Sequence, residues 1–447
     1  MFQIAIPQPV EEILSALEAA GFPAVVVGGC VRDSLLGKTP HDWDVATAAR
    51  PEEMKQALSR FRLAETGIRH GTLTVRNQGE AVETTTFRQD GSYGDSRHPD
   101  TVTFTRSLET DLSRRDFTVN AMAYSPKRGL VDLFGGQEDL QAKVLRCVGN
   151  PEQRFTEDAL RIVRAMRFSA VLDFSIEPAT GEAILAQKER LRYLARERIA
   201  DELKKLLCAP GAARILGAFA PAVWEMIPEL EPCFGQQQYN PHHFGTVWEH
   251  TLAALEHAEP ILPVRLAVLL HDIGKPACFS REENGVGHFY GHAAKSTEIA
   301  DAVCRSLRLD NVLRERVMLL VRYHDGPMIG NEKLIRRRLR QLGEEAFFQL
   351  LAVQTADTLG QAEPYRSQRL PQLAQVGEQT RQILAERPCL TMDALAISGR
   401  DLIAAGMNPG PEMGRVLRRL LEAVSEGELD NTSAVLLNYA QQIREKI

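Results

Sequence analysis

The stretch "GGCVRDSLLGKTPHDWDVAT" (28–47) decides how the N-terminal part of this chain is interpreted. It contains a pair of glycines, the tripeptide Gly37-Lys38-Thr39 and two closely spaced aspartates, a composition that suggests a phosphate site. A Walker-type loop requires a glycine five residues before the glycine that precedes the lysine. Arg32 occupies that position, and Gly28-Gly29 lie too far upstream. The spacing therefore disfavours a Walker loop, and the phosphates must be held in another way.

Asp42 and Asp44 provide that other way. Alternate side chains of an extended stretch share a face, so both carboxylates should point one way, and Trp43 and Val45 should point into the core. Adjacent carboxylates repel unless a cation lies between them, and Mg²⁺ commonly bridges carboxylates to substrate phosphates. Two such ions can hold the attacking and leaving oxygens of an in-line displacement. An isolated pair of this kind is usually a solvated turn, but the preceding glycines and Arg32 favour a nucleotide site.

The residues around the aspartates complete this prediction. Gly28 and Gly29 let the backbone approach phosphates closely, and Arg32 can form paired hydrogen bonds with phosphate oxygens. Lys38-Thr39 is then predicted to be loop. Glu83 is a candidate third carboxylate, and the alternative is a solvated glutamate on an edge strand.

Composition predicts a globular protein of several domains. The 447 residues exceed one ordinary core, and contents of 44% hydrophobic and 25% charged residues are typical of globular chains. No apolar run approaches a membrane span and the N-terminus lacks signal-peptide features, so no membrane partner is expected. Seven scattered cysteines without a CxxC pair indicate free thiols in a reducing cytoplasm. With a net charge of −6, RNA contacts would depend on the basic stretches 188–198 and 333–342, each of which alone is more simply a solvated helix face.

Hydrophobic spacing separates a mixed N-terminal part from a helical remainder. Helical spacing runs through Val10, Ile13, Leu14 and Leu17 and is also predicted over 31–36. Extended stretches are predicted at 24–27, 42–47, 71–76 and 81–87. After about residue 150 the strand signals fade, and helical segments such as 155–172 follow. The predicted fold class is α+β, a small mixed sheet followed by an all-α part, and the Pro/Gly-marked segment 399–415 introduces a separate C-terminal piece.

The pattern GGxVRDxLLGxxPxDxDxAT resembles the nucleotidyltransferases of the polymerase-β superfamily. Three later stretches, "RRDFTVNAMAY" (114–124), "RFTEDALRIVRAMRF" (154–168) and "ARERIADEL" (195–203), resemble successive motifs of the bacterial class II CCA-adding enzymes. The resemblance covers essentially the whole chain. It implies addition and repair of the 3′-terminal CCA of tRNA without a nucleic-acid template. The expected partners are CTP, ATP and tRNA lacking part or all of its CCA end, with Mg²⁺ in the head.

The same resemblance implies a domain order and further site residues. The expected parts are a head (1–150), a neck with a base-recognition helix (151–215), an HD-type body (216–385) and a tail (386–447). The residues expected to contact the phosphates and ribose are Arg114, Arg115, Asp116 and Asn120. Asp116 would favour a 2′-hydroxyl, and the alternative is a charged helix start capped by Asp116. The polar segment 90–99 has too little apolar character for a core element, and in this family such a loop is associated with the switch from C to A addition.

Asp158 and Arg161 are predicted to read the base. They are three residues apart on a predicted helix, with Thr156 as its N-cap, and so share a face. Cytosine and adenine present an amine beside an unprotonated ring nitrogen, which suits a carboxylate acceptor and a guanidinium donor. Uracil and guanine present the reverse order, and opposed polar groups in a closed site discriminate strongly. The resemblance assigns this role to the pair, with Glu157 as a positioning neighbour and Arg164 as a further nucleotide-binding residue. The alternative is an ordinary intrahelical ion pair.

A second group of site residues lies in the helical part. His250, His271-Asp272 and Asp357 occur in "VWEHT", "LLHDIGKP" and "QTADTLGQ", with His292 and His324 between them. Imidazole together with carboxylate suits a transition metal. The order resembles the HD superfamily of metal-dependent phosphohydrolases and implies a metal site at His250, His271, Asp272 and Asp357. Hydrolase activity does not follow from the fold alone, and the alternative is a set of polar groups that satisfy one another inside a helical bundle.

Three other functions fit part of the chain. A bacterial poly(A) polymerase would share the head, but the segment 88–104 and the HD-type body fit a CCA-adding enzyme better. An RNA-binding protein with an inactive head conflicts with the intact Asp42 and Asp44. A phosphohydrolase of the HD type alone leaves the head motifs unexplained.

Overall fold

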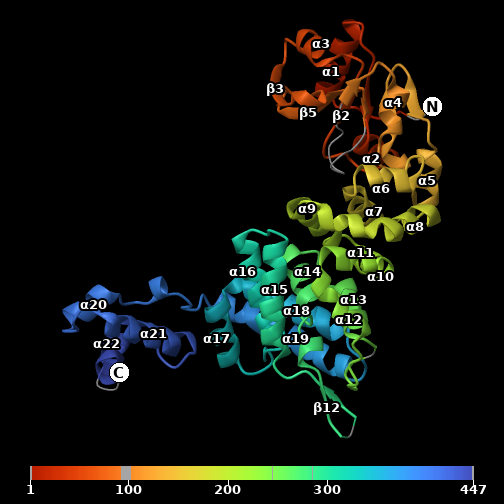
Figure 1. Ribbon diagram of the computed structural model, residues 1–447. Coiled ribbons are helices and arrows are strands. Elements are labelled where there is room, and N and C mark those ends of the chain that lie inside the picture. Colours follow the sequence, from red (N-terminus) through yellow and green to blue (C-terminus); the bar gives the residue numbers. More distant parts are fainter. Residues whose placement is uncertain (1–2, 92–101, 244, 284, 445–447) are drawn as a thin grey trace. The chain divides into compact units, whose positions relative to one another are not determined.

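The computed structural model describes residues 3–91, 102–243, 245–283 and 285–444. The chain forms two compact units, Met1–Pro228 and Glu229–Ile447 (Figure 1). The four-part division at residues 150, 215 and 385 stays a prediction. Among the described helices, none combines the length and the apolar character that a bilayer crossing requires.

Unit 1 begins with a mixed seven-stranded sheet of order β3-β4-β5-β2-β1-β8-β9. The strands are β1 Ala24–Val27, β2 Asp44–Thr47, β3 Arg62–Gly67, β4 Thr72–Asn77, β5 Glu80–Thr86, β8 Met122–Ser125 and β9 Gly129–Asp132. β2 and β5 pair in parallel, and the other neighbours are antiparallel. A separate pair, β6 Arg88–Asp90 and β7 Val102–Phe104, flanks the segment that was predicted to switch from C to A addition. Residues 92–99 of that segment lie outside the described residues.

Helices of unit 1 pack on this sheet because of their apolar faces. They are α1 Gln8–Ala19, α2 Gly29–Leu35, α3 Pro51–Ala57, α4 Leu108–Ser113 and α5 Gly136–Ala142. In α1 the four residues predicted from helical spacing, Val10, Ile13, Leu14 and Leu17, are all buried, which confirms that prediction. Leu112 of α4 joins Val25, Val27 and Phe87 in a core cluster on the sheet. The central strand β2, which carries Asp44, is thereby supported by a packed interior.

Apart from the short parallel pair β10 Val144–Leu145 and β11 Ser175–Ile176, the rest of unit 1 is helical. Its helices are α6 Pro151–Glu157, α7 Leu160–Leu172, α8 Pro178–Gln187, α9 Arg196–Leu207, α10 Ala212–Ala218 and α11 Ala220–Met226. One prediction here is wrong. The stretch 154–168 is not one helix, because Asp158 adopts extended angles (φ −142°, ψ 106°) between α6 and α7. Asp158 and Arg161 therefore do not share a helix face. Thr156 is also not an N-cap, since Asn150 caps α6.

Unit 2 is a helical bundle followed by a small tail. The bundle contains α12 Glu231–Gly235, α13 Val247–His257, α14 Leu262–Leu270, α15 His292–Ser306, α16 Asn311–Tyr323, α17 Glu332–Leu342, α18 Glu344–Leu359 and α19 Tyr365–Ala385. A hairpin of β12 Ser280–Arg281 and β13 Gly287–His288 projects from it (Figure 1). This hairpin was not predicted, because two-residue strands are too short to show alternation.

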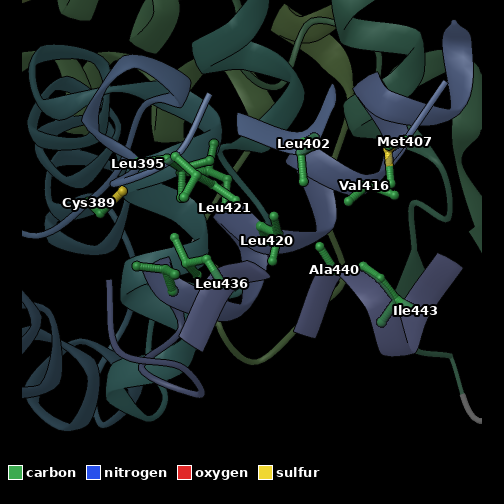
Figure 2. Packing of buried hydrophobic residues seen from close by; sticks show 12 residues of the cluster. Cys389, Leu395, Leu402, Met407, Val416, Leu420, Leu421, Leu436, Ala440 and Ile443 are labelled. Atoms are coloured by element: carbon green, nitrogen blue, oxygen red, sulfur yellow. The ribbon is translucent and has the colours of Figure 1, made fainter. Parts of the chain in front are cut away.

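The tail has a hydrophobic cluster of its own. It is built from α20 Gly399–Ala404, α21 Pro411–Ser425 and α22 Ser433–Arg444. Leu402, Leu420 and Leu436, one from each helix, are buried together in this cluster (Figure 2). Lys333 of α17 forms an ion pair with Glu426 at 3.1 Å and so connects the bundle to the tail.

Candidate active site

The predicted carboxylates meet at one face of the sheet. Asp44 begins β2 and Asp42 precedes it, and both are exposed, whereas Trp43 and Val45 are buried. This confirms the predicted alternation. Glu83 pairs with Asp44 in the parallel β2–β5 ladder and is also exposed. β5 has a strand on each side, so the alternative that placed Glu83 on an edge strand is wrong.

Negative charge accumulates at this face. The pKa of Asp44 is raised because the surrounding protein removes water from its carboxylate and because Glu83 and Asp42 repel its charge. Arg115 opposes this shift from the other side. Three carboxylates on one face of the sheet offer the oxygen ligands that Mg²⁺ prefers. The residues present therefore fit the predicted magnesium site.

Gly28 allows an arginine to approach the turn before α2. Its φ of +78° is a conformation that side chains disfavour, and a Cβ at this position would lie 3.0 Å from Nη1 of Arg115. Asp111 holds Arg115 through a contact of 3.3 Å and holds Arg114 through a contact of 2.7 Å. Gly29 opens α2 directly after this turn. Two of the predicted phosphate ligands, Gly28 and Arg115, thus lie beside the carboxylates.

The other head residues form one hydrogen-bonded chain. Arg32 donates to Oδ1 of Asn120 at 2.6 Å, and Asn120 donates to Oδ1 of Asp116 at 3.3 Å. Arg164 donates to Oδ2 of Asp116 at 2.6 Å. Asp116 follows α4 and caps no helix start, so the capping alternative is wrong. Arg32 is buried and donates also to Asp33, which makes it an organiser of Asn120 in this structure.

The side chains of the predicted base-reading pair, Asp158 and Arg161, bind different partners, and Arg161 contacts the head. Arg161 donates to Oε2 of Glu157 at 2.6 Å and to the carbonyl oxygen of Arg114 at 2.9 Å. Asp158 accepts from Nη2 of Arg198 at 2.9 Å. A cavity of about 660 Å³ opens beside them. Among the described residues its walls include Glu157 and Arg114, but neither Asp158 nor Arg161.

Several organising residues were not identified from the sequence. They are Asp111, which holds two arginines, Arg198, which holds Asp158, Glu202, which pairs with Arg167, and Phe168, which lies under Arg32 and Arg164. Arg198 and Glu202 lie within the quoted motif 195–203, so the motif marked their region without their partners.

The second predicted group does converge, inside unit 2. Nε2 of His250 lies 2.9 Å from Oδ1 of Asp357 and 3.3 Å from Nε2 of His271. Nε2 of His292 lies 3.2 Å from Nε2 of His324, and each lies within 4 Å of Oδ1 of Asp272. Two overlapping sets of metal-ligand atoms result, one with His250 and His271 and the other with His292 and His324, and Asp272 belongs to both.

The hydrogen bonds of these histidines determine which ring nitrogen can bind a metal. The Nδ1 atoms of His250, His271, His292 and His324 each lie 2.7–3.1 Å from a backbone carbonyl oxygen. A carbonyl only accepts, so each Nδ1 carries a proton, and each Nε2 faces the carboxylates. Burial opposes a charge on His271, but Asp272 and Asp357 outweigh burial and raise its pKa to about 10. The surroundings of His271 therefore stabilise positive charge, whereas burial lowers the pKa of His292, and the imidazole and carboxylate donors together fit a transition metal.

A cavity of about 290 Å³ opens onto this second group. Its walls also include His243, Gln361 and Lys275, which the sequence prediction did not assign. Lys275 is buried and its Nζ lies 2.7 Å from Oδ2 of Asp272. The run "HDIGK" (271–275) was the available signal for Lys275.

Comparison with known proteins covers the whole chain. Residues 24–146 match the family model described as "Poly A polymerase head domain", and residues 173–218 match "Probable RNA and SrmB- binding site of polymerase A". Residues 281–440 match a model for tRNA nucleotidyltransferase domain 2. The CCA-adding enzyme of Limosilactobacillus fermentum is 36% identical over 437 residues, which cover 98% of this chain and 97% of that protein. That of Levilactobacillus brevis is 33% identical over 440 residues, which cover 98% and 96%.

Solved structures agree. The Bacillus stearothermophilus CCA-adding enzyme in complex with CTP superposes with a TM-score of 0.74 at 28% identity and covers 99% of both chains. A Thermotoga maritima CCA-adding enzyme complexed with tRNA has a TM-score of 0.62 at 19% identity, covers 98% of this chain and 96% of that one, and supports the fold alone.

Proposed function

The chain belongs to the family of bacterial CCA-adding enzymes, and from this premise we infer that it adds and repairs the 3′-terminal CCA of tRNA using CTP and ATP. The carrying observation is the Asp44–Glu83 strand pair with Asp42 and Arg115 beside it, within a chain that aligns over its whole length with CCA-adding enzymes. In this reaction the 3′-hydroxyl oxygen of the tRNA bonds to the α-phosphorus, and the bond from that phosphorus to pyrophosphate breaks. The seven free cysteines support a cytoplasmic location.

The head residues divide the work of binding. Asp42 and Asp44, with Glu83 beside them, would hold Mg²⁺, which when bound neutralises phosphate charge and polarises the α-phosphorus. Arg115 lies where it can donate to phosphate oxygens above the Gly28 turn. The chain Arg32–Asn120–Asp116 presents fixed polar groups that can accept from and donate to a ribose.

Base selection requires the pair Asp158 and Arg161 to change partners. Each is engaged by protein groups in this structure. The amine of cytosine or adenine would take the place of Arg198 as the donor to Asp158. The ring nitrogen of the base would take the place of the Arg114 carbonyl oxygen as the acceptor from Arg161. The models with poly(A) polymerase names match residues 24–146 and 173–218, whereas the CCA-adding relatives align over 98% of this chain, which favours a CCA-adding enzyme over a poly(A) polymerase.

The test uses tRNA that lacks its CCA end. Each NTP is offered singly and in mixtures, and the product ends are sequenced. The wild type should accept CTP and ATP. Asp44→Asn should lower incorporation of both by more than about 100-fold and leave tRNA binding intact, because a metal-held triphosphate is needed for the chemistry only. Asp173→Asn is the matched control, since Asp173 is exposed, left-handed (φ 55°) and far from these groups in the sequence. Near wild-type addition by Asp44→Asn would remove the metal assignment.

We further propose that unit 2 hydrolyses phosphate esters at RNA ends. The two overlapping ligand sets that share Asp272 support this second function. His250, His271, Asp272 and Asp357, with His292 and His324, would hold transition-metal ions, which when bound lower the pKa of a bound water. The Nδ1 hydrogen bonds orient the four rings, and Lys275 can donate to a phosphate oxygen. For a 2′,3′-cyclic phosphate, the oxygen of a first water bonds to phosphorus, the P–O3′ bond breaks, and O3′ takes a proton, which leaves a 2′-phosphate. A second water then releases that phosphate in the same way, with the proton passing to O2′.

Metal analysis and hydrolysis assays test this proposal. After supplementation with nickel, cobalt or manganese, the protein should retain metal and hydrolyse 2′,3′-cyclic nucleotides or phosphomonoesters. His271→Ala should lose both properties, and His257→Ala, an exposed histidine of α13, should keep them. Absence of both bound metal and hydrolysis in the wild type would leave these residues a structural role only.

A further inference from the structure

An aromatic side chain stands exposed at the rim of the second cavity. Tyr290 is 75% exposed, more than any other described aromatic residue of unit 2. It lines the same cavity as Asp272, His292 and His324. A ring exposed to water does not contribute the stabilisation that its burial would give. Its exposure at this cavity therefore suggests a role in binding.

The ring of Tyr290 is stacked on the imidazole of His288. Strand β13 ends at His288, and Phe289 and Tyr290 follow it directly in the chain. Phe289 faces inward, with its ring centroid 5.5 Å from that of Phe279 and 5.3 Å from Nζ of Lys275. The rings of His288 and Tyr290 are parallel to within 5° with centroids 5.1 Å apart, and His288 is partly buried whereas Tyr290 is exposed. Glu282 holds His288 through a contact of 3.0 Å.

Close backbone packing fixes this two-ring stack relative to the cavity. A Cβ on Gly287 would lie 2.2 Å from the carbonyl oxygen of Gln238, so only glycine permits the approach. The amide of Gly287 donates to the carbonyl oxygen of Tyr239 at 2.9 Å. The hairpin end is therefore docked on the segment before α13, and the rings are held in place before any ligand arrives.

The stack is also tied to the metal-ligand set. His292, two residues after Tyr290, donates from Nδ1 to the carbonyl oxygen of Phe289 at 2.9 Å. The Cα atoms of Tyr290 and His292 are at most about 7 Å apart, and both side chains line the same cavity of about 290 Å³. A phosphate at the ligand set and a base on the tyrosine ring can then belong to the same nucleotide.

We propose that the Tyr290 ring, supported by His288, is a stacking surface for the nucleobase next to the phosphate that unit 2 hydrolyses. Its substrates are accordingly base-bearing, a nucleotide or an RNA 3′ end, and a simple phosphate ester binds more weakly. The proposal rests on the hydrolase function proposed above. Aromatic stacking accepts any base, which suits tRNAs whose terminal nucleotides differ.

The first test compares substrates with and without a base. The full-length protein with nickel is assayed on 2′,3′-cyclic AMP and on glycerol 1,2-cyclic phosphate, which carries the same cyclic ester without a base. Tyr290→Ala should raise KM for 2′,3′-cyclic AMP about 5- to 100-fold and leave KM for the glycerol ester unchanged. Tyr290→Phe should restore the wild-type value, and Tyr193→Ala, an exposed tyrosine of unit 1, should behave as wild type.

The second test does not depend on hydrolysis. Stacking quenches 2-aminopurine fluorescence, so 2-aminopurine riboside 2′-phosphate is titrated with metal-free protein. Quenching should occur with the wild type and Tyr290→Phe and be lost with Tyr290→Ala. Equal quenching in Tyr290→Ala, or equal KM changes for both esters, would overturn the proposal. A loss of self-association with unchanged KM would instead assign the ring to a protein contact. A wild type that hydrolyses neither ester but quenches normally would reject the hydrolase function and retain the stacking surface.

Discussion

The guanidinium of Arg161 already donates three hydrogen bonds at the junction of α6 and α7. It donates to Glu157 and to the carbonyl oxygens of Arg154 and Arg114. Charge-assisted hydrogen bonds are worth about 1.5–3 kcal/mol each, so a donor is released only if another acceptor takes its place. A cytosine or adenine ring nitrogen is such an acceptor, whereas the N–H of uracil or guanine is not. If Arg161 reads the base as proposed, its resting contacts add to the selectivity of the exchange.

Arg161→Lys should weaken this selection. Lysine keeps the charge but loses the planar fork that joins Glu157 and two carbonyl groups. We expect misincorporation of UTP and GTP relative to CTP and ATP to rise about 10- to 100-fold, which corresponds to the loss of one or two hydrogen bonds. Single-nucleotide incorporation with each NTP measures this ratio. An unchanged ratio would exclude Arg161 from base reading, and Arg214→Lys is a control on a surface ion pair of the same unit.

At the residue scale, the sequence pattern was sufficient to predict which side chains of a single strand are exposed and which are buried. The alternation of Asp42, Trp43, Asp44 and Val45 follows from the two-residue period of extended chain, and the structure confirms it. The partner of Asp44 could not be read in this way. Glu83 reaches Asp44 through a parallel pairing of distant strands, and no local period encodes that register.

The same limit applies to elements. The periodicity of α1 was sufficient to predict its four buried residues, because one face of a helix repeats within a single stretch. The break at Asp158 interrupts an otherwise helical pattern. Asp158 leaves the helix where its carboxylate accepts from Arg198 of α9 and from the amide of Leu160, and α9 lies some 40 residues downstream. A tertiary contact here overrides a local preference.

The end of α4 carries a buried charge cluster with a consequence for stability. Burial alone would raise the pKa of Asp111, but the guanidinium groups of Arg114 and Arg115 outweigh it and hold the pKa below its usual value. A depressed carboxyl pKa stabilises the fold above the unfolded-state pKa of about 4, and this contribution is lost as the pH falls through the folded-state pKa. Asp111→Asn should therefore destabilise unit 1 by about 1–3 kcal/mol at pH 7 and by less near pH 3.

Urea unfolding at both pH values measures this difference. The wild type should lose more stability between pH 7 and pH 3 than the variant does. Glu109→Gln, an exposed carboxyl of the same helix, serves as the control. A destabilisation by Asp111→Asn that is equal at both pH values would show that its charge does not contribute.

The β6–β7 pair allows a second test at this scale. Asp90 pairs with Val102, so the ends of the connecting segment are fixed by a short ladder. A variant that lacks several residues of 92–99 but keeps that ladder should still add both C residues and then stop. The reason is that the corresponding segment of related enzymes is associated with the switch from C to A addition. The 3′-end sequences of the products report the result. Continued A addition by the shortened protein would contradict the assignment.

At the scale of the whole molecule, each proposed metal site is built from one unit. The first consists of Asp42, Asp44 and Glu83 (the Asp44 set), and the second consists of Asp272 and the histidines around it (the Asp272 set). The Asp44 set belongs entirely to Met1–Pro228 and the Asp272 set entirely to Glu229–Ile447. No ligand residue of either set comes from the other unit. The two activities should therefore fail independently when one residue of either set is replaced.

A tRNA that ends in a 2′,3′-cyclic phosphate tests this independence in one reaction. Such an end has no free 3′-hydroxyl, so nucleotide addition must wait until hydrolysis has cleared it. The wild type with magnesium and nickel should convert it to a CCA end, while His271→Ala and Asp44→Asn should each fail alone. His271→Ala should still extend a tRNA with a free 3′-hydroxyl, because its Asp44 set is unchanged. Mixing the two variants should restore CCA addition to the blocked tRNA, because the cleared product of one can diffuse to the other. If the mixture fails although each variant retains its own activity on simple substrates, the two steps require both sites in one molecule, and the independence argued from the two units is wrong.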